Sequence, residues 1–366
     1  IKAKNLFSII SFNCIKNLNP GGYFINILSD AFLTNTYYKE FREFLIAELD
    51  IFELCLTPRD LFRHINADVG TCIIFGQKKT STDIVFNNWI PKKKNKIKLI
   101  DRLLSENEYN NNKKTEWILQ EEIKKYPNSQ ILIGLSKEIR DLYLKSKLKL
   151  GDIAGGGTGI STGKDKLYLK KTKEIKKNKS SWVPYFKNAA RSKYFYEPVF
   201  SIEKNYKKYH KKIPNYLIRN EKFFFKEGIS CSSVGIRFSA AYMPKGCLFG
   251  VNANFFFKNE DDLYYVLAFL NTKIAWYFAR KVLIRTNNIS ANYLRKMPII
   301  FPRSFKLKKD IVKMTQQIVQ RLKNDKNFNT SDFENKMDTL FYKIYKINDL
   351  DKSRIEKFSK NFYEEL

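Results

Sequence analysis

The sequence predicts an α/β domain with a partial doubly wound sheet, followed by an α+β domain and a helical tail. Three observations predict this order. Apolar strands alternate with an amphipathic helix in the first 76 residues, short β-like runs fill residues 223–257, and helical spacing follows from residue 260.

The first domain opens with an amphipathic helix that "NPGG" ends. Leu6, Ile9, Ile10, Phe12 and Ile15 recur there at helical spacing. Three apolar runs then predict buried strands: "YFINILSD" (23–30), "DIFELCL" (50–56) and "VGTCIIFG" (69–76).

The segment "TNTYYKEFREFLIAEL" (34–49) predicts a helix between the first two strands. Strands that are apolar along most of their length, joined through a helix, predict a sheet covered on both faces. Only about half of a doubly wound sheet is accounted for, so the chain is expected to be a fragment.

The remaining residues predict a connector, a second domain and a tail. Residues 80–150 combine the basic run "PKKKNKIK" with a polar stretch and predict a connector with some helix. Glu260–Leu283 predicts a strong helix, with acidic residues in its first turn and basic residues near its end. The tail predicts two or three helices, the last over "LDKSRIEKF".

The charge balance points to a polyanionic partner. The 366 residues contain 67 Lys and Arg against 37 Asp and Glu, a formal charge of +30. Such an excess favours nucleic acid or an anionic membrane surface, although a genome that favours lysine codons explains part of it. No apolar run reaches the roughly 18 residues of a membrane span, so no membrane segment is expected.

The cysteines and histidines exclude other classes of site. The five cysteines are scattered and predict reduced core residues in a cytoplasmic protein; they are Cys14, Cys55, Cys72, Cys231 and Cys247. With only His64 and His210, no zinc site is expected and histidine-based catalysis has little support.

The glycine-rich stretch "GDIAGGGTGISTGKDKLY" (151–168) invites comparison with a phosphate-binding loop. A P-loop needs G-x-x-x-x-G-K-[ST]. Thr158 replaces the first glycine and Asp165 follows Lys164, and a carboxylate there repels phosphate. A flexible hinge between domains is one alternative.

Several stretches together resemble the adenine-specific DNA methyltransferases of restriction–modification and phage-exclusion systems, in the form that carries a TaqI-like C-terminal specificity domain. They are "NLNPGGYFINILSDAFLTNTYYKEFREFL", "KEGISCSSVGIRFSAAYMPKGCLF", "YYVLAFLNTKIAWYF" with "NNISANYLRKMPI", and the tail "DTLFYKIYKIND". Their order along the chain matches that of the family. The resemblance implies double-stranded DNA as partner and S-adenosylmethionine as methyl donor to adenine N6.

The family's catalytic motifs are absent from this sequence. The glycine-rich S-adenosylmethionine turn and the N-P-P-Y/F tetrapeptide are expected upstream of Ile1, and Gly21 replaces the second proline in "NLNPGG". The resemblance therefore implies no catalytic residue in this chain, a cofactor site mostly outside it, and a missing N-terminal half without which it is inactive. The implied parts are the C-terminal half of the catalytic domain (1–85), a connector (86–145), a target-recognition domain (146–305) and a helical tail (306–366).

The resemblance also implies site residues. Phe62 is expected to stack on the flipped adenine, with a core or hinge phenylalanine as the alternative. The glycine stretch is expected to open the recognition domain. The side chains expected at DNA are Thr162, Lys164, Ser230, Ser232, Ser233, Arg237, Arg285, Asn287 and Asn288.

Simpler roles for these residues remain open. The serine and asparagine groups also suit ordinary β-turns, and the basic runs suit solvated faces. For the whole chain, the alternatives are a DNA-specificity module or degenerate remnant without chemistry, and a basic RNA-binding protein.

Overall fold

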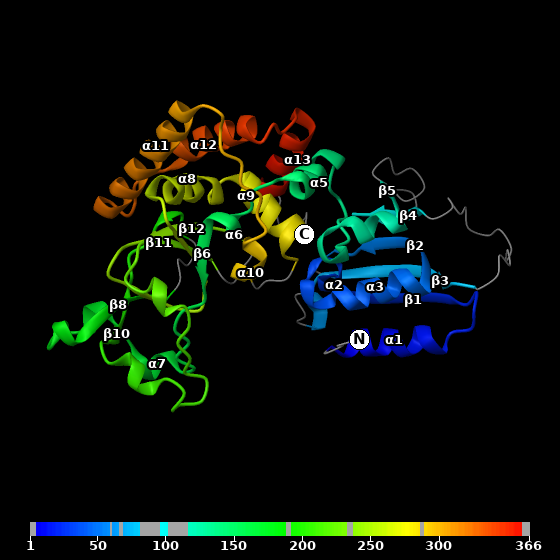
Figure 1. The fold of residues 1–366 in the computed structure, drawn as a ribbon, viewed down its shortest axis with the longest axis horizontal. Coiled ribbons are helices and arrows are strands. Elements are labelled where there is room, and N and C mark those ends of the chain that lie inside the picture. The colour runs from blue at the N-terminus through cyan, green and yellow to red at the C-terminus, as the bar shows by residue number, and fades with distance from the viewer. Residues whose placement is uncertain are drawn as a thin grey trace. The chain divides into compact units, whose positions relative to one another are not determined.

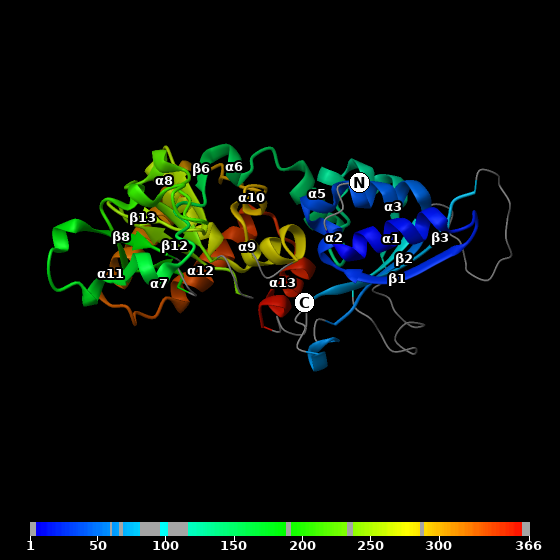
Figure 2. The ribbon, with the colours of Figure 1, turned by 90° about the horizontal axis from the view of Figure 1, so that it is seen from below.

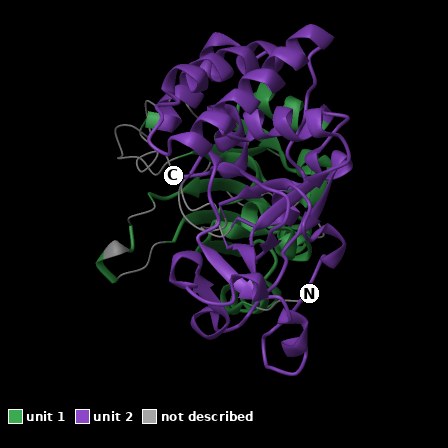
Figure 3. Ribbon diagram, turned by 90° about the vertical axis from the view of Figure 1, so that its left-hand side faces the viewer, with its two compact units in different colours: residues 1–144, 281–286, 360–366 green, residues 145–280, 287–359 purple. Residues whose placement is uncertain are grey.

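The computed structural model describes residues 5–58, 61–65, 69–80, 96–101, 116–187, 192–232, 237–285 and 289–360. The chain forms two compact units (Figure 3). Unit 1 comprises residues 1–144, 281–286 and 360–366, and unit 2 comprises residues 145–280 and 287–359.

The elements of unit 1 follow the predicted order and add two strands. They are α1 (Leu6–Asn17), β1 (Tyr23–Ser29), α2 (Ala31–Thr34), α3 (Lys39–Glu48), β2 (Leu49–Leu56), β3 (Thr71–Lys78), β4 (Lys96–Ile100), β5 (Glu116–Leu119) and α5 (Lys137–Lys145). The last of these runs one residue into unit 2.

The elements of unit 2 are short strands followed by helices. The strands are β6 (Ala154–Gly157), β7 (Leu169–Lys171), β8 (Trp182–Phe186), β9 (Tyr194–Phe195), β10 (Phe200–Glu203), β11 (Gly228–Cys231), β12 (Ala240–Met243), β13 (Leu248–Phe249) and β14 (Ala253–Phe257). The helices are α6 (Leu150–Ile153), α7 (Asp165–Tyr168), α8 (Glu260–Leu270), α9 (Lys273–Tyr277), α10 (Ala291–Leu294), α11 (Phe305–Asn324), α12 (Ser331–Ile344) and α13 (Asp349–Lys360).

A five-stranded mixed sheet organises unit 1 in the order β1-β3-β2-β4-β5. Strand β3 is antiparallel to both β1 and β2, and β4 is parallel to β2. The mixed α/β class is therefore confirmed. Strands β4 and β5 lie in the segment predicted as a connector, so the sheet is wider than the sequence indicated.

Helices cover one face of this sheet. Figure 2 shows α1 and α3 on the same side of the strands, and Phe24, Leu28 and Ile74 pack there in one core with residues of both helices. On β1, the alternate side chains Tyr23, Ile25 and Ile27 are exposed. The prediction of a sheet covered on both faces is therefore wrong along β1.

Two sheets form the β part of unit 2 (Figure 1). One is five-stranded, in the order β6-β14-β11-β12-β9, and the other is four-stranded, in the order β13-β8-β10-β7. Aromatic side chains such as Phe249, Phe224 and Phe256 pack in a core that joins residues of both sheets.

Residues Ala154–Gly157 of the glycine stretch form the edge strand β6. Gly155 and Gly156 pair with β14, and a Cβ on Gly155 would lie 2.4 Å from the Phe223 ring. Arg295 donates to the main-chain oxygen of Gly156 at 2.6 Å. Glycine is thus required for close packing at this edge.

The predicted helix Glu260–Leu283 is divided in the structure. Helix α8 ends at Leu270, directly before Asn271, and Thr272 caps α9 by accepting from the Ala275 amide. A π-helical segment, Phe278–Leu283, follows. The Asn271 side chain bonds both main-chain groups of Ala240 on β12, so tertiary contacts set the break.

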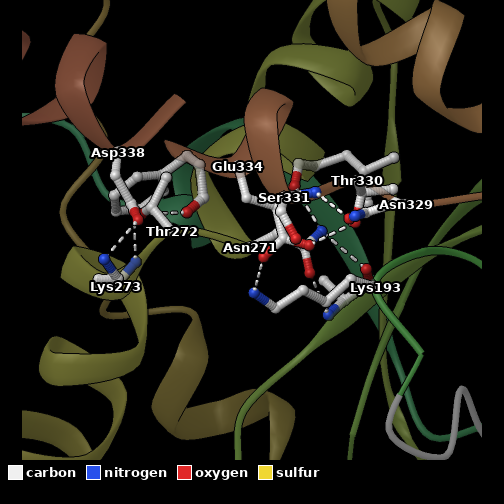
Figure 4. A network of polar contacts seen from close by, with 12 residues as sticks. Lys193, Asn271, Thr272, Lys273, Asn329, Thr330, Ser331, Glu334 and Asp338 are labelled. Carbon is white, nitrogen blue, oxygen red and sulfur yellow. Dashed lines mark hydrogen bonds and ion pairs between the residues drawn. The ribbon is translucent and has the colours of Figure 1, made fainter. Parts of the chain in front are cut away.

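The tail contains three helices, α11, α12 and α13, which agrees with the predicted two or three. Polar contacts attach α12 to the rest of unit 2 (Figure 4). Lys193 pairs with Glu334 at 2.5 Å, and Asp338 accepts from the Lys273 amide at 2.9 Å. The Lys273 ammonium also reaches Glu356 on α13 at 2.7 Å.

Candidate nucleic-acid interface

Phe62 lies between β2 and β3, in the described segment 61–65. Its side chain is partly exposed, and its main-chain oxygen accepts from the Ile65 amide at 3.1 Å. Its neighbours Leu61 and Ile65 are exposed. These surroundings allow a ring to meet a base, and the stacking role stays a prediction.

Thr162 and Lys164, two of the residues expected at DNA, differ in their exposure to solvent. Thr162 is buried and its hydroxyl donates to the Asp165 carboxylate. Lys164 is exposed at the residue before α7. Asp165, which argued against a P-loop, is an acidic residue in the first turn of α7 and pairs with Lys187 at 2.9 Å. Of the two predicted residues, only Lys164 presents its side chain to solvent.

The serine-rich predicted site lies at the ends of β11 and β12. Ser230 is buried in β11, and its hydroxyl accepts from the Asn252 side-chain amide at 3.4 Å. The Ser232 hydroxyl accepts from the Ser239 amide at 3.2 Å. Arg237 is exposed, whereas Ser233 lies outside the described residues. Arg237 is therefore the side chain of this group that the structure places at the surface.

Arg285 is buried in unit 1, with 6% of its surface exposed. Its guanidinium lies 3.5 Å from the Asp30 carboxylate and donates to the main-chain oxygen of Ile133 at 3.4 Å. Asn287 and Asn288 lie outside the described residues. No sequence pattern indicated Asp30 as a partner, because the two residues are far apart in the chain.

The described residues hold no cluster of His, Cys, Asp and Glu suited to a metal ion. Burial raises the pKa of the Cys55 thiol to about 12 and that of Cys72 well above its usual value. Cys231 and Cys247 are buried too. Cys14 is exposed, so the prediction of a core position is wrong for that cysteine. Within the described ranges, no helix combines the length and apolarity that crossing a membrane requires.

By sequence this chain is similar to adenine-specific methyltransferases, and its fold is similar to that of a restriction–modification enzyme. No family model matches the chain. The adenine-specific methyltransferase BrxX of Escherichia coli O9:H4 (strain HS) is 30% identical over 196 residues, which cover 50% of this chain and 16% of that protein. The adenine-specific methyltransferase PglX of Lacticaseibacillus casei (strain Zhang) is 26% identical over 233 residues, covering 57% of this chain and 19% of that protein.

The chain thus matches less than a fifth of the length of either relative. Among solved structures, the Type IIL restriction–modification enzyme MmeI in complex with DNA has a TM-score of 0.55 and 10% identity, over 97% of this chain and 51% of that chain. This likeness concerns the fold alone. The predicted resemblance to adenine-specific methyltransferases is confirmed as sequence similarity, and the TaqI-like specificity domain stays a prediction.

Proposed function

We propose that this chain is the DNA-recognition part of a site-specific adenine-N6 methyltransferase of a restriction–modification or phage-exclusion system. The observation that carries the proposal is the 30% identity with an adenine-specific methyltransferase over half of the chain. The fold shared with a DNA-bound restriction–modification enzyme and the formal charge of +30 support it.

The proposed partner within the same system is an N-terminal methyltransferase half. The exposed apolar side chains of β1 support this partner, since Ile25 is 66% exposed and Tyr23 and Ile27 lie beside it. Among the described strands, β1 pairs with β3 alone, which leaves its other edge available. The partner would carry the catalytic tetrapeptide and most of the S-adenosylmethionine site, and that cofactor would supply the methyl group for adenine N6.

Within this chain, Phe62 is the proposed stacking residue for the flipped adenine. Lys164 and Arg237 are proposed DNA contacts because both are exposed. Ser233, Asn287 and Asn288 are also proposed DNA contacts, and this proposal rests on the sequence resemblance to adenine-specific methyltransferases alone. Thr162, Ser230, Ser232 and Arg285 have protein partners, so their proposed contribution is to hold the loops that carry those contacts.

A DNA-specificity module without chemistry is the second candidate. The observation that favours it is that Lys164 and Arg237, the exposed candidate contacts, suit DNA binding and need no chemistry. Such a module would bind the same duplex sites, and no partner would make it methylate adenine. A basic RNA-binding protein is the third candidate, and structured RNA would then compete better than duplex DNA.

Selection from a library of random duplexes tests the recognition role. The purified chain should enrich one sequence motif that contains adenine, and excess structured RNA should leave that enrichment unchanged. Enrichment of no motif, or its loss to structured RNA at equal nucleotide concentration, would contradict the proposed function.

A further inference from the structure

The connection between β7 and β8 displays lysines on an ordered backbone. We call residues 172–181 the lysine loop. Both flanking strands pair with β10. Its exposed lysines are Lys173, Lys176, Lys177 and Lys179.

Several contacts hold this loop in place. Ile175 is buried and anchors its middle. The Thr172 hydroxyl bonds the Ser201 hydroxyl at 2.9 Å, and the Ser181 main-chain oxygen accepts from the Lys204 amide at 2.9 Å. Because the backbone is fixed at both ends and in the middle, its ammonium groups are presented from defined positions.

The charge of the lysine loop is not neutralised in the described part of the chain. Its single acid, Glu174, pairs with Lys171 at 3.4 Å, and none of the four exposed lysines has an ion pair among the described residues. Lys204 lies beside the last residue of the loop, because its amide donates to the Ser181 main-chain oxygen at 2.9 Å. Its side chain is exposed and adds another ammonium group. Residues 160–226 contain 19 Lys and Arg against five Asp and Glu, so the surroundings reinforce the positive potential.

We propose that the lysine loop, together with Lys204, binds the phosphates of duplex DNA outside the recognised sequence. This deepens the proposed function, on which it rests for the class of partner. Ammonium groups act as point charges that suit phosphates, whereas base edges are read by forked or amide side chains. The loop contributes affinity and position on the duplex, and it does not contribute sequence choice.

The composition of the loop favours duplex DNA over other polyanions. Residues 172–181 contain no aromatic side chain, and single-stranded nucleic acid is bound by stacking on such rings. The neighbouring Trp182 ring is covered by the Lys170 ammonium at 4.9 Å from its centroid. The only large apolar side chain of the loop, Ile175, is buried, so the loop offers no apolar group to insert into a lipid surface.

The salt dependence of duplex binding tests this proposal. One variant carries K173Q, K176Q, K177Q and K179Q, and a matched control carries K306Q, K313Q, K336Q and K343Q, which are exposed lysines of α11 and α12. The probe is a labelled duplex without the motif enriched in selection. Each lost phosphate contact lowers the slope of log affinity against log salt by about 0.9. The loop variant should lose about 3 to 4 units of slope, and the control less than about 1.

A charge-retaining variant with arginine at the same four loop positions should keep the wild-type slope. Equal losses in the loop variant and the matched control would overturn the proposal. So would an unchanged duplex slope in the loop variant together with lost binding to structured RNA or to vesicles of anionic phospholipid. The motif enriched in selection should be the same for wild type and loop variant. If the wild type enriched no motif, the proposed function would be overturned. The proposal for the lysine loop would still be tested, because the slope is measured on a duplex without that motif.

Discussion

The Arg285 guanidinium lies 3.5 Å from the Asp30 carboxylate, and both side chains are buried in unit 1. Gly70 makes room for this pair, because a Cβ there would lie 2.5 Å from an Asp30 carboxylate oxygen. Lys281 and Asp101 form a second pair at 3.6 Å, and a Cβ on Gly134 would lie 2.2 Å from Asp101. Two cations of residues 281–286 are thus held by acids of the first 144 residues.

Replacing Arg285 by alanine should destabilise the protein strongly. The change leaves the Asp30 carboxylate buried without its guanidinium, and breaking a buried pair from one side costs about 3–5 kcal/mol. Urea unfolding followed by fluorescence measures the loss. A matched control is K309A, which breaks the more exposed pair with Asp261 at 2.7 Å and should cost less than about 1 kcal/mol. Equal losses for the two variants would contradict a special role for the Asp30–Arg285 pair.

Arg42 is expected to tolerate neither alanine nor lysine. The buried guanidinium donates to the main-chain oxygens of Phe32, Asn35, Asn128 and Ser129 at 2.5–2.9 Å. A lysine cannot form this fork, so R42K should lose about 2–3 kcal/mol of unfolding free energy, and R42A at least as much. Wild-type stability of R42K in urea unfolding would show that the fork is not needed.

Gly159 is expected to be irreplaceable for reasons of space. A Cβ at that position would lie 2.1 Å from the Phe249 main-chain oxygen, so G159A should cost about 2–3 kcal/mol. Gly246 provides the control, because it has a φ of +83° and no atom within 4 Å of its added Cβ. G246A should cost about 1–2 kcal/mol through backbone conformation alone. Thermal unfolding compares them, and a smaller shift for G159A than for G246A would contradict the packing argument.

Thiol labelling of the native protein should be fast at Cys14 and slow at the other four cysteines. Thiolate is the reactive form, and burial raises the pKa of Cys55 to about 12 and that of Cys247 to about 11. Mass spectrometry after brief exposure to an alkylating reagent at about pH 8, near the usual thiol pKa, gives the labelled sites. C14S should abolish the fast phase and leave the slow phase intact. Fast labelling of Cys55 would mean that β2 is not buried as the structure has it.

The sequence predicted those helices and strands whose own residues show helical spacing or a continuous apolar run. The helical spacing of Leu6–Ile15 and the apolar run at residues 69–76 correspond to α1 and β3. Strand β4 was missed because Lys96 and Lys98 alternate with apolar residues inside a basic run. Its pairing with β2 and β5, which no local pattern reveals, makes it a strand. The break at Asn271 was missed for a similar reason, since its partner Ala240 lies on β12.

The candidate site was predicted less well than the fold. The residue types of "GISCSSVGIRF" indicated a polar loop, and Arg237 at its end is exposed. Burial of Ser230 and Arg285 depends on Asn252 and Asp30, which no local pattern connects to them. The lysines of residues 170–179 were visible in the sequence, but their fixed presentation depends on the buried Ile175.

Adenine methylation in a host that carries the complete gene tests the central claim most directly. Long-read sequencing of that host's DNA should show N6-methyladenine at one motif, and this motif should match the one that the purified chain enriches from random duplexes. Deleting residues 145–360 from the gene should abolish the methylation. Absence of methylated adenine, or a methylated motif unrelated to the enriched one, would contradict the claim that this chain recognises DNA for an adenine methyltransferase.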